Sequence, residues 1–347
     1  MPEPRSEFER IASLTAGLPP GEGVVVGPGD DAAVLRPREG RDLVATTDAF
    51  VEGRHFRRAL FTPAEIGSRL AAANLSDLAA MAAEPRWALL SLVVPPAWSH
   101  AECLLLERAC ARALAQHGAA IVGGNLASTP GAFTASLTLL GDVVRGAAWT
   151  RRGARPGDVI AVTGAPGSAA VFLALATQAD PPSRARVPHD IVERVVAPGA
   201  RVKLARALAA TGGVRAAIDL SDGLAEDLAH VCTASGVGAR IDEASLPADP
   251  ALEQAARALA ALAGDESEPS GGPALLTRLR LGASDDYELL LSIDPMKWPE
   301  CERIAFDSKV PLARVGEFTA DRARVLVTAT GSTPLDMSGW DHFTPHD

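Results

Sequence analysis

The chain has 347 residues, which is enough for two domains that each bury a hydrophobic core. Its hydrophobic content of 47% and charged content of 22% are those of an ordinary globular protein. The net charge of −10 argues against a nucleic-acid or anionic-membrane partner, because either would require a basic face. A phosphate-bearing substrate remains compatible with this charge, because bound Mg²⁺ can reverse the local field.

The sequence shows no export or membrane signal. Residues 1–7 are too polar for a secretory signal peptide, and the most apolar stretch, 87–94, is far too short to span a bilayer. We therefore expect a soluble, cytoplasmic protein. The four cysteines include no Cys-x-x-Cys pair, so we expect buried thiols rather than a zinc site or a disulfide framework.

The first half of the chain predicts a mixture of helices and strands. Pro63 opens a long helical pattern that runs to about Ala83, and proline is favoured in the first turn of a helix. The alternation over 134–144 indicates a strand with one face toward a core. The other predicted helices are 7–16 and 101–116, and the other predicted strands are 24–26, 32–35, 43–47, 88–94 and 119–122. This mixture indicates an α/β or α+β first half.

The composition changes around residues 145–158, where Gly, Arg and Pro dominate without apolar periodicity. We place a domain boundary there, which gives domains at 1–148 and 149–347. The segment 266–273, rich in Gly, Pro, Ser and Glu, should form a flexible surface loop. The second half predicts strands at 159–163, 216–220, 287–293 and 324–328, and helices that begin at 168, 190, 200 and about 222.

Four short acidic stretches lie at the edges of apolar runs, where the chain should turn at the rim of a core. They are Gly-Asp-Asp-Ala at 29–32, Thr-Thr-Asp at 46–48, Asn-Leu-Ser-Asp at 74–77 and Asp-Leu-Ser-Asp-Gly at 219–223. Two carboxylates about 4 Å apart would repel each other by roughly 4 kcal/mol at an effective dielectric of about 20. Hard oxygen ligands suit Mg²⁺, which shares phosphate oxygens with its substrate. The stretches therefore predict a magnesium-dependent site for a nucleotide phosphate chain.

The familiar nucleotide-binding motifs do not explain these stretches. Segment 27–32 loosely imitates a dinucleotide fingerprint, but its two carboxylates would repel a pyrophosphate and Pro28 has no N–H to donate. The chain contains no Walker A motif. Asp30 and Asp31 adjoin a predicted strand, so their side chains should point to opposite faces and only one should face a site.

Two of the stretches fall on or beside predicted helices. Asn74 and Asp77 are three residues apart and share a helix face. They are either polar surface positions or, as their apolar neighbours favour, positions that face a cleft. Ser221 and Asp222 stand where a helix N-cap belongs. A plain cap explains one of these two residues but leaves Asp219 unexplained. The helix start also offers N–H groups and a positive dipole end to phosphate.

Two further positions have alternative interpretations. Gly123-Gly124, directly after a predicted strand, would let a nucleotide approach the backbone or would form a tight turn. Arg151 and Arg152 at the domain boundary are either solvated linker charges or phosphate ligands, for which arginine is well shaped.

Taken in order, the motifs resemble those of the thiamine-monophosphate kinases, over nearly the whole chain. They are Gly-Asp-Asp-Ala-Ala-Val-Leu at 29–35, Thr-Thr-Asp at 46–48 followed by His55, Asn-Leu-Ser-Asp-Leu-Ala-Ala-Met at 74–81, Val-Thr-Gly at 162–164, Ile-Asp-Leu-Ser-Asp-Gly-Leu at 218–224, Asp-Tyr-Glu-Leu at 286–289 and Gly-Trp-Asp-His-Phe at 339–343. The resemblance implies a two-domain aminoimidazole ribonucleotide synthetase-like fold, with an N-terminal ATP-binding α/β domain and a C-terminal α+β domain. It also implies a homodimer formed through strands of the N-terminal domain.

The resemblance implies ATP-dependent phosphorylation of thiamine monophosphate to thiamine diphosphate, with several Mg²⁺ ions. The implied magnesium ligands are Asp30, Thr46, Thr47, Asp48, Asp77, Asn125, Asp219 and Asp222. The implied ATP contacts are Gly124, Asn125, Arg151 and Ser221, and the implied thiamine-phosphate contacts are His55, Asp285 and Trp340. Two positions depart from the family pattern. The family's Gly-Gly-Asp ends in Asn125, which removes a charge, and its Gly-Gly-Glu-Asp-Tyr-Glu has Asp285 in place of the first glutamate, which shortens the side chain by one methylene.

No general base is expected, because a phosphate acceptor with a second pKa of about 6 is already largely dianionic at neutral pH. Catalysis would consist of positioning and charge neutralisation, as in phosphoryl transfer generally. Two alternatives remain open: a related ATP-using enzyme with another acceptor, and a catalytically weak protein that binds ATP or thiamine phosphate.

Overall fold

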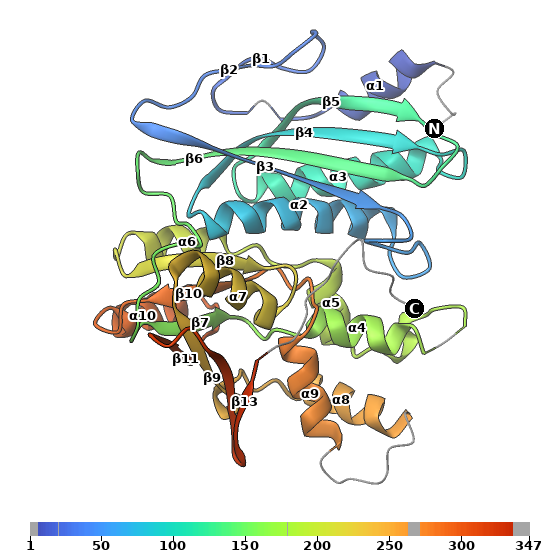
Figure 1. The fold of residues 1–347 in the computed structure, drawn as a ribbon. Coiled ribbons are helices and arrows are strands. Elements are labelled where there is room, and N and C mark those ends of the chain that lie inside the picture. The colour runs from blue at the N-terminus through green and yellow to red at the C-terminus, as the bar shows by residue number, and fades with distance from the viewer. Residues whose placement is uncertain (1–5, 20, 179, 263–270, 336–347) are drawn as a thin grey trace. The chain divides into compact units, whose positions relative to one another are not determined.

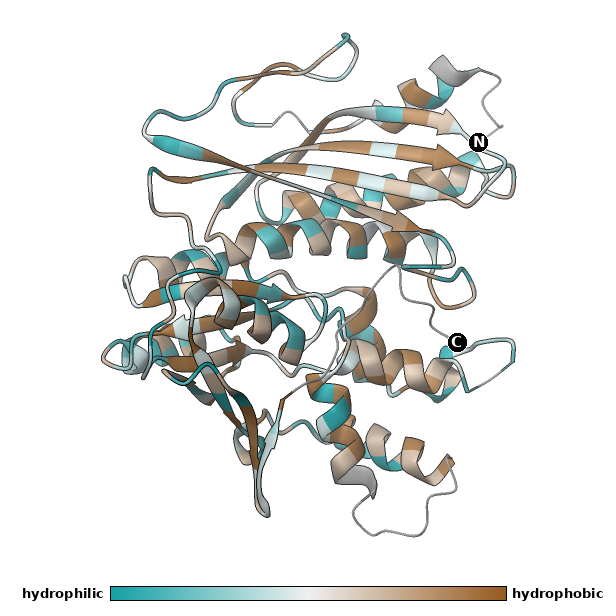
Figure 2. Ribbon diagram, viewed as in Figure 1, coloured by the Kyte–Doolittle hydropathy of each residue, from teal (hydrophilic) through white to brown (hydrophobic). Residues whose placement is uncertain are grey.

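The computed structural model describes residues 6–19, 21–178, 180–262 and 271–335. The chain divides into two compact units (Figure 1). The first comprises the residues up to Ala148 together with Val196–Val202, and the second comprises Trp149–Val195 and the residues from Lys203 onward. The short segment Val196–Val202 thus belongs to the first unit, which the sequence did not indicate. Figure 2 shows hydrophobic residues concentrated in the strands and helices of each unit.

The first unit is built on a four-stranded sheet with the order β3-β6-β4-β5. Its strands are β3 (Arg41–Val51), β4 (Glu84–Val94), β5 (Ala120–Ser128) and β6 (Thr134–Val144). Strand β6 runs antiparallel to β3 and β4, whereas β4 and β5 are parallel. Helices α2 (Pro63–Ala80) and α3 (His100–Ala115) lie side by side against one face of this sheet (Figure 1).

The two helices that cover the sheet both begin at N-cap residues that favour the start of a helix. Thr62 caps α2 and forms a reciprocal capping box with Glu65, and Ser99 and Glu102 form the same arrangement at α3. The helices approach closely at Gly67, where an added Cβ would lie 2.1 Å from the backbone oxygen of Leu106. This glycine therefore allows α2 and α3 to pack as one layer.

The opposite face of the sheet carries a short hairpin of β1 (Val24–Val26) and β2 (Val34–Leu35). Its apolar residues pack on a small core of Trp87, Ala120 and Val122 from β4 and β5. The N-terminal helix α1 (Glu7–Thr15) packs against α3, and the hydroxyl of Ser13 lies 2.6 Å from Nε2 of His100.

The second unit is built on a seven-stranded sheet with the order β13-β12-β9-β11-β7-β10-β8. All neighbouring strands in it are antiparallel except the pair β9 and β12. The strands are β7 (Val159–Thr163), β8 (Val214–Leu220), β9 (Gly238–Asp242), β10 (Glu288–Ile293), β11 (Leu312–Thr319), β12 (Arg324–Thr328) and β13 (Gly331–Pro334). The helices are α4 (Ser168–Ala176), α5 (His189–Val196), α6 (Val202–Ala209), α7 (Leu224–Ser235), α8 (Pro250–Leu262), α9 (Gly271–Leu281) and α10 (Trp298–Asp307), with 3₁₀ turns at Arg184–Arg186 and Glu243–Ser245.

Several sequence predictions are confirmed in detail. Strands β6, β7 and β12 have the predicted bounds, and α2 begins at Pro63. All four cysteines are free and buried. In the part of the chain that the structure describes, no helix is long and apolar enough to cross a membrane.

The predicted loop at 266–273 is wrong over its last three residues, which belong to α9. Residues 266–270 lie outside the described residues. Strands β3 and β5 are longer than predicted. Their additional residues include polar residues and glycines, which pair with the neighbouring strand although many of their side chains are exposed.

Candidate functional site

One group of predicted ligands meets between β3 and α2. In the antiparallel register Thr46 lies opposite Leu139 and Asp48 opposite Leu137, and both leucines are fully buried on the side covered by α2. The side chains of Thr46 and Asp48 therefore point toward α2. The Thr46 hydroxyl donates a hydrogen bond to Oδ2 of Asp77 on that helix. Burial, together with the charge of Asp77, raises the pKa of Asp48 to about 6. Two carboxylates thus share a partly buried site, where a cation would relieve their repulsion.

Thr47 lies on the opposite face of the same strand. It is exposed and pairs with Thr138, whose hydroxyl donates to Oγ1 of Thr47 over 3.0 Å. The Thr47 hydroxyl in turn donates to the backbone oxygen of Leu137 over 3.2 Å. Its side chain cannot reach the ion that Asp48 would hold on the α2 side, so only its backbone carbonyl remains as a possible ligand there.

Asn74 and Asp77 differ in exposure, which departs from the expectation of a shared cleft-facing surface. Asn74 is fully buried and its amide donates to the backbone oxygen of Leu70 over 3.0 Å. Its Oδ1 has no hydrogen-bond partner among the described residues. Asp77 is only partly buried. Asn74 therefore lies within the packing of α2, and Asp77 alone of the two faces the candidate site.

Asp30 lies in the turn between β1 and β2. Both Asp30 and Asp31 are exposed, and the amide of Asp31 donates to Oδ1 of Asp30 over 3.0 Å. Gly29 precedes them with φ of +119°, a conformation that glycine adopts at low cost. The hairpin thus presents the Asp30 carboxylate to solvent.

Gly124 and Asn125 lie within β5, so the tight turn considered for Gly123-Gly124 is wrong. A Cβ at Gly124 would lie 1.8 Å from the backbone oxygen of Leu90 on β4. The close approach of the two strands therefore requires this glycine, whatever binds nearby. Asn125 pairs with Ser91 and is exposed.

His55 holds the end of β3. Its ring stacks on Phe50 with 5.7 Å between centroids, and Nδ1 accepts a hydrogen bond from the amide of Val51 over 3.0 Å. Because Nδ1 is the acceptor, the neutral imidazole carries its proton on Nε2. His55 is partly exposed, so its Nε2 edge is the part of the ring suited to meet a ligand.

In the second unit, Asp219 is buried at the end of β8, and the partly buried Ser221 and Asp222 follow it. The helix that comes next, α7, has Gly223 at its N-cap, with φ of +113° and no side-chain cap. The alternative interpretation, that Ser221 or Asp222 is a plain N-cap, is therefore wrong.

Asp227, in the first turn of α7, replaces that cap. Its Oδ2 accepts hydrogen bonds from the amides of Ser221, Asp222 and Gly223 over 3.1–3.2 Å. These three amides, which precede the helix, are consequently not available to phosphate, and phosphate binding by the first N–H groups of α7 itself stays a prediction. Burial, together with the charge of Asp222, raises the pKa of Asp227 to about 7 against the opposing effect of the three amide hydrogen bonds. An acidic residue in the first turn of a helix was the only sequence signal for this role.

Asp286 and Ser284 provide the corresponding cap for α4. The carboxylate of Asp286 accepts from the amides of Gly167 and Ala169 over 2.6 and 3.0 Å, and Ser284 accepts from Ala170 over 3.2 Å. Burial raises the pKa of Asp286 to about 6, against the two amide hydrogen bonds. These residues hold the turn 164–167 against the segment that contains Asp285.

Asp285 itself is partly buried and accepts a hydrogen bond from the Tyr287 hydroxyl over 3.4 Å. Tyr287 has φ of +54°, which is rare for a bulky residue. Its amide donates to the backbone oxygen of Leu220 over 2.9 Å. The strained tyrosine therefore links the Asp285 segment to the end of β8, immediately before Ser221 and Asp222.

Glu288 joins two of the sequence motifs. It accepts a hydrogen bond from the Thr163 hydroxyl, and that hydroxyl accepts from the amide of Leu289 over 2.8 Å. A Cβ at Gly164 would lie 2.0 Å from Oε1 of Glu288. Much of Val-Thr-Gly and Asp-Tyr-Glu is therefore explained by packing and hydrogen bonding within the second unit.

Two predicted residues remain. The Arg151 side chain is exposed, and its backbone oxygen accepts a hydrogen bond from Ser235 over 3.1 Å. Trp340 lies outside the described residues.

The predicted magnesium ligands carry oxygen atoms, which are the ligand type that a hard divalent cation prefers. Across the described ranges, no three His, Cys, Asp or Glu side chains lie close enough together to form a metal-binding group. Asp30, Asp48 and Asp77 belong to the first unit, and Asp219 and Asp222 to the second. The pair Asp48 and Asp77, with the Thr46 hydroxyl, offers only oxygen ligands, and burial together with the charge of Asp77 raises the pKa of Asp48.

Comparisons with known proteins match both halves of the chain. Residues 29–143 match the family model described as AIR synthase related protein, N-terminal domain, and residues 155–328 match the corresponding C-terminal domain. The chain is 35% identical to the thiamine-monophosphate kinase of Escherichia coli K12 over 92% of each chain. A crystal structure of thiamine-monophosphate kinase from Stenotrophomonas maltophilia K279a superposes with a TM-score of 0.76 at 31% identity, over 92% of this chain and 95% of that one. AaThiL complexed with AMPPCP and TMP has the same fold, with a TM-score of 0.73 at 24% identity over 89% of each chain.

Proposed function

Because the chain belongs to the thiamine-monophosphate kinase family of AIR synthase related proteins, we propose that it transfers the terminal phosphoryl group of ATP to thiamine monophosphate, with Mg²⁺ ions neutralising the phosphate charges. The observation that carries this proposal is the meeting of Thr46, Asp48 and Asp77 between β3 and α2. It places two carboxylates and a hydroxyl at a partly buried point where an apolar core would otherwise continue.

Bound Mg²⁺ would supply charge neutralisation for the phosphate chain and for the phosphoryl group in transfer. The residues proposed to hold it are Asp30, Thr46, Thr47, Asp48, Asp77, Asn125, Asp219 and Asp222. Thr47 would contribute through its carbonyl, because its hydroxyl lies on the other face of β3. The Thr46 hydroxyl orients one oxygen of Asp77, and the Asp48 carboxylate shares the same face of β3.

The remaining predicted residues would contact the two substrates. We propose Gly124, Asn125, Arg151 and Ser221 for ATP, and His55, Asp285 and Trp340 for thiamine monophosphate. His55 would offer its Nε2 edge, since Nδ1 already accepts from Val51. No side chain needs to remove a proton, because the acceptor phosphate has a second pKa of about 6 and is largely dianionic at neutral pH. This agrees with a site rich in carboxylates.

The proposal extends to the organisation of the protein. Residues 1–148 would form the ATP- and magnesium-binding domain, and 149–347 the α+β domain. The protein would be cytoplasmic. A homodimer through the strands of the N-terminal domain is supported by exposed apolar side chains on the sheet face opposite α2. These are Leu43 on β3, Leu89 on β4 and Val144 on β6.

Acceptor dependence tests the function against its alternatives. ADP release by the purified protein would be measured with ATP and Mg²⁺, with and without thiamine monophosphate. The kinase requires release that depends on thiamine monophosphate. Release without it would indicate a relative with another acceptor, and tight binding of either ligand without release would indicate a binding protein.

A further inference from the structure

Arg280 lies in the last turn of α9, in the second unit, and is only 8% exposed. Its Nε and Nη2 atoms are buried, and neither has a hydrogen-bond partner among the described residues. These two nitrogens form one edge of the guanidinium, which can bind two oxygens of a carboxylate or a phosphate at once. A buried cation without a partner is unfavourable, because it has lost its hydration and gained no interaction in return. The edge therefore requires an acceptor that the described residues do not supply.

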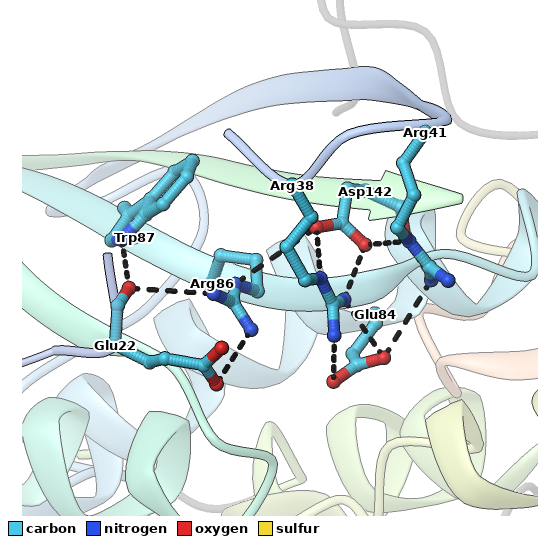
Figure 3. A network of polar contacts seen from close by, with 7 residues as sticks. All are labelled: Glu22, Arg38, Arg41, Glu84, Arg86, Trp87 and Asp142. Carbon is cyan, nitrogen blue, oxygen red and sulfur yellow. Dashed lines mark hydrogen bonds and ion pairs between the residues drawn. The ribbon is translucent and has the colours of Figure 1, made fainter. Parts of the chain in front are cut away.

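Arg38 shows how the same edge is satisfied in the first unit (Figure 3). Nε of Arg38 donates to one oxygen of Asp142 over 2.8 Å, and Nη2 donates to the other oxygen of that carboxylate. Arg41 binds the same carboxylate from the start of β3. Arg280 is buried more deeply than Arg38, whose side chain is 31% exposed, yet its edge faces no such carboxylate.

Two carboxylates at the start of α8 act on the charge of Arg280, but each has an arginine of its own. Asp249 forms an ion pair with Arg194 over 2.7 Å, and Glu253 lies 4.0 Å from Arg257. Neither accepts a hydrogen bond from Nε or Nη2 of Arg280. Burial lowers the pKa of Arg280, and the two carboxylates oppose this shift without cancelling it. Three arginines against two carboxylates leave this group with one uncompensated positive charge.

The helices around Arg280 leave little room beside it. Helices α4, α8 and α9 pack against one another. A Cβ at Gly167 would lie 3.1 Å from Cα of Arg280, so the turn before α4 packs directly on this residue. The Asp286 carboxylate that holds this turn accepts from the amides of Gly167 and Ala169, and not from Nε or Nη2 of Arg280. A ligand of Arg280 must therefore be small or must present a small anionic group.

We infer that Nε and Nη2 of Arg280 form a binding site for a phosphate group in the second unit, near the start of α8. A phosphate offers two oxygens to the guanidinium edge and supplies the negative charge that the group lacks. It carries a charge of about −1.5 to −2 at neutral pH, so it compensates a buried cation more strongly than a carboxylate does. None of the residues proposed for ATP, Mg²⁺ or thiamine monophosphate belongs to this site, so the inference does not depend on the proposed function.

The test compares the thermal unfolding of the unaltered protein and of Arg280→Met in chloride buffer and with inorganic phosphate at the same ionic strength. Methionine keeps part of the apolar stem and removes the charge. Arg278→Met is the matched control, because Arg278 lies on the same helix and is exposed. Without phosphate, the midpoint of Arg280→Met should equal or exceed that of the unaltered protein, because the variant loses an unpaired buried charge.

Phosphate at about ten times its dissociation constant should raise the midpoint of the unaltered protein by about 3 °C more than that of Arg280→Met. Arg278→Met should respond as the unaltered protein does. An equal rise in the unaltered protein and in Arg280→Met would place the phosphate elsewhere and overturn the inference. A lower midpoint for Arg280→Met, by the same amount with and without phosphate, would mean that a carboxylate of the chain pairs with Arg280, and it would also overturn the inference.

Arg280→Lys tests the site even if Arg280→Met does not fold. Lysine keeps the charge and loses the two-nitrogen edge, so phosphate should bind about tenfold more weakly than to the unaltered protein. Equal affinity would refute the role of the edge. A second series with thiamine monophosphate distinguishes the sources of the phosphate group. A rise that depends on Arg280 at lower concentrations of thiamine monophosphate than of inorganic phosphate would assign the site to the phosphate ester, and the reverse order would assign it to free phosphate.

Discussion

The Thr46 hydroxyl donates a hydrogen bond to the Asp77 carboxylate, which ties the middle of β3 to the last turns of α2. Asp48, two residues along β3, shares this face of the sheet and has a raised pKa. The contact fixes one oxygen of Asp77 while leaving two like charges close together. The first unit therefore retains an electrostatic cost that a bound cation would remove.

Asp77→Asn should abolish phosphoryl transfer without weakening the fold. The amide oxygen of asparagine can still accept from Thr46, and the repulsion with Asp48 disappears. In buffer with a chelator, the midpoint of thermal unfolding should stay level or rise slightly. A clear fall would mean that the charge of Asp77 is needed for folding.

Asp48 should make metal-free stability depend on pH. Its pKa in the fold, about 6, exceeds the ordinary value of 3.8, so its contribution to stability is fully present below pH 3.8 and is lost as pH rises through about 6. Asp48→Asn should remove this component. The check is the difference in unfolding midpoint between the two proteins from pH 4.5 to 8 with a chelator. The asparagine variant should gain relative stability as pH rises, and a constant difference would refute the assignment.

Mg²⁺ should counteract that loss, because the ion binds the ionised form of Asp48. The midpoint of the unaltered protein should rise on addition of Mg²⁺ and ATP, more at pH 8 than at pH 5. The Asp48→Asn variant should show a smaller rise at pH 8. Equal shifts in both proteins would place the ion elsewhere.

Asp227→Ala should destabilise the second unit, because one buried amide and two partly buried amides lose their acceptor. The expected cost is about 2 kcal/mol in the free energy of unfolding, the usual scale for orphaned buried donors. Glu226→Gln, on the same turn but only partly buried, should cost far less. Urea unfolding of both variants provides the measurement, and similar values would show that Asp227 is not the cap of α7.

Asn125→Asp should lower the Mg²⁺ concentration needed for half-maximal activity. A carboxylate attracts the ion more strongly than an amide oxygen, and Asn125 is exposed on β5, so packing should barely change. A Mg²⁺ titration of both proteins at saturating ATP decides the point. An unchanged or higher requirement would mean that position 125 is not a metal ligand.

Much of the fold is visible in the sequence, but of the predicted magnesium ligands the structure brings together only Thr46, Asp48 and Asp77. The alternation over Thr134–Val144 predicted β6, and Pro63 predicted the start of α2, because both signals are local. The two-domain AIR synthase-like fold followed from the motif order, and the family models confirm it. The direction of Thr47 could not be predicted, because it depends on the register of β3 against β6.

Residues whose roles depend on contacts between distant segments could not be recognised from the sequence. Gly123-Gly124 has the sequence of a turn, yet Gly124 is required inside β5 by the backbone of Leu90. Asp142 lies near the end of the alternating pattern of β6, where the sequence alone indicates an ordinary surface charge. In the structure, three arginines from segments distant in the sequence lie around it. Such roles arise from contacts between segments tens of residues apart.

The most direct test of the central claim is the product balance of the purified protein with ATP, Mg²⁺ and thiamine monophosphate. ADP and thiamine diphosphate would be quantified together for the unaltered protein, for Asp77→Asn and for Glu39→Gln, a control at an exposed carboxylate of the same unit. We expect equal amounts of both products from the unaltered protein and from Glu39→Gln, and neither product from Asp77→Asn. ADP without thiamine diphosphate, or full activity in Asp77→Asn, would contradict the account.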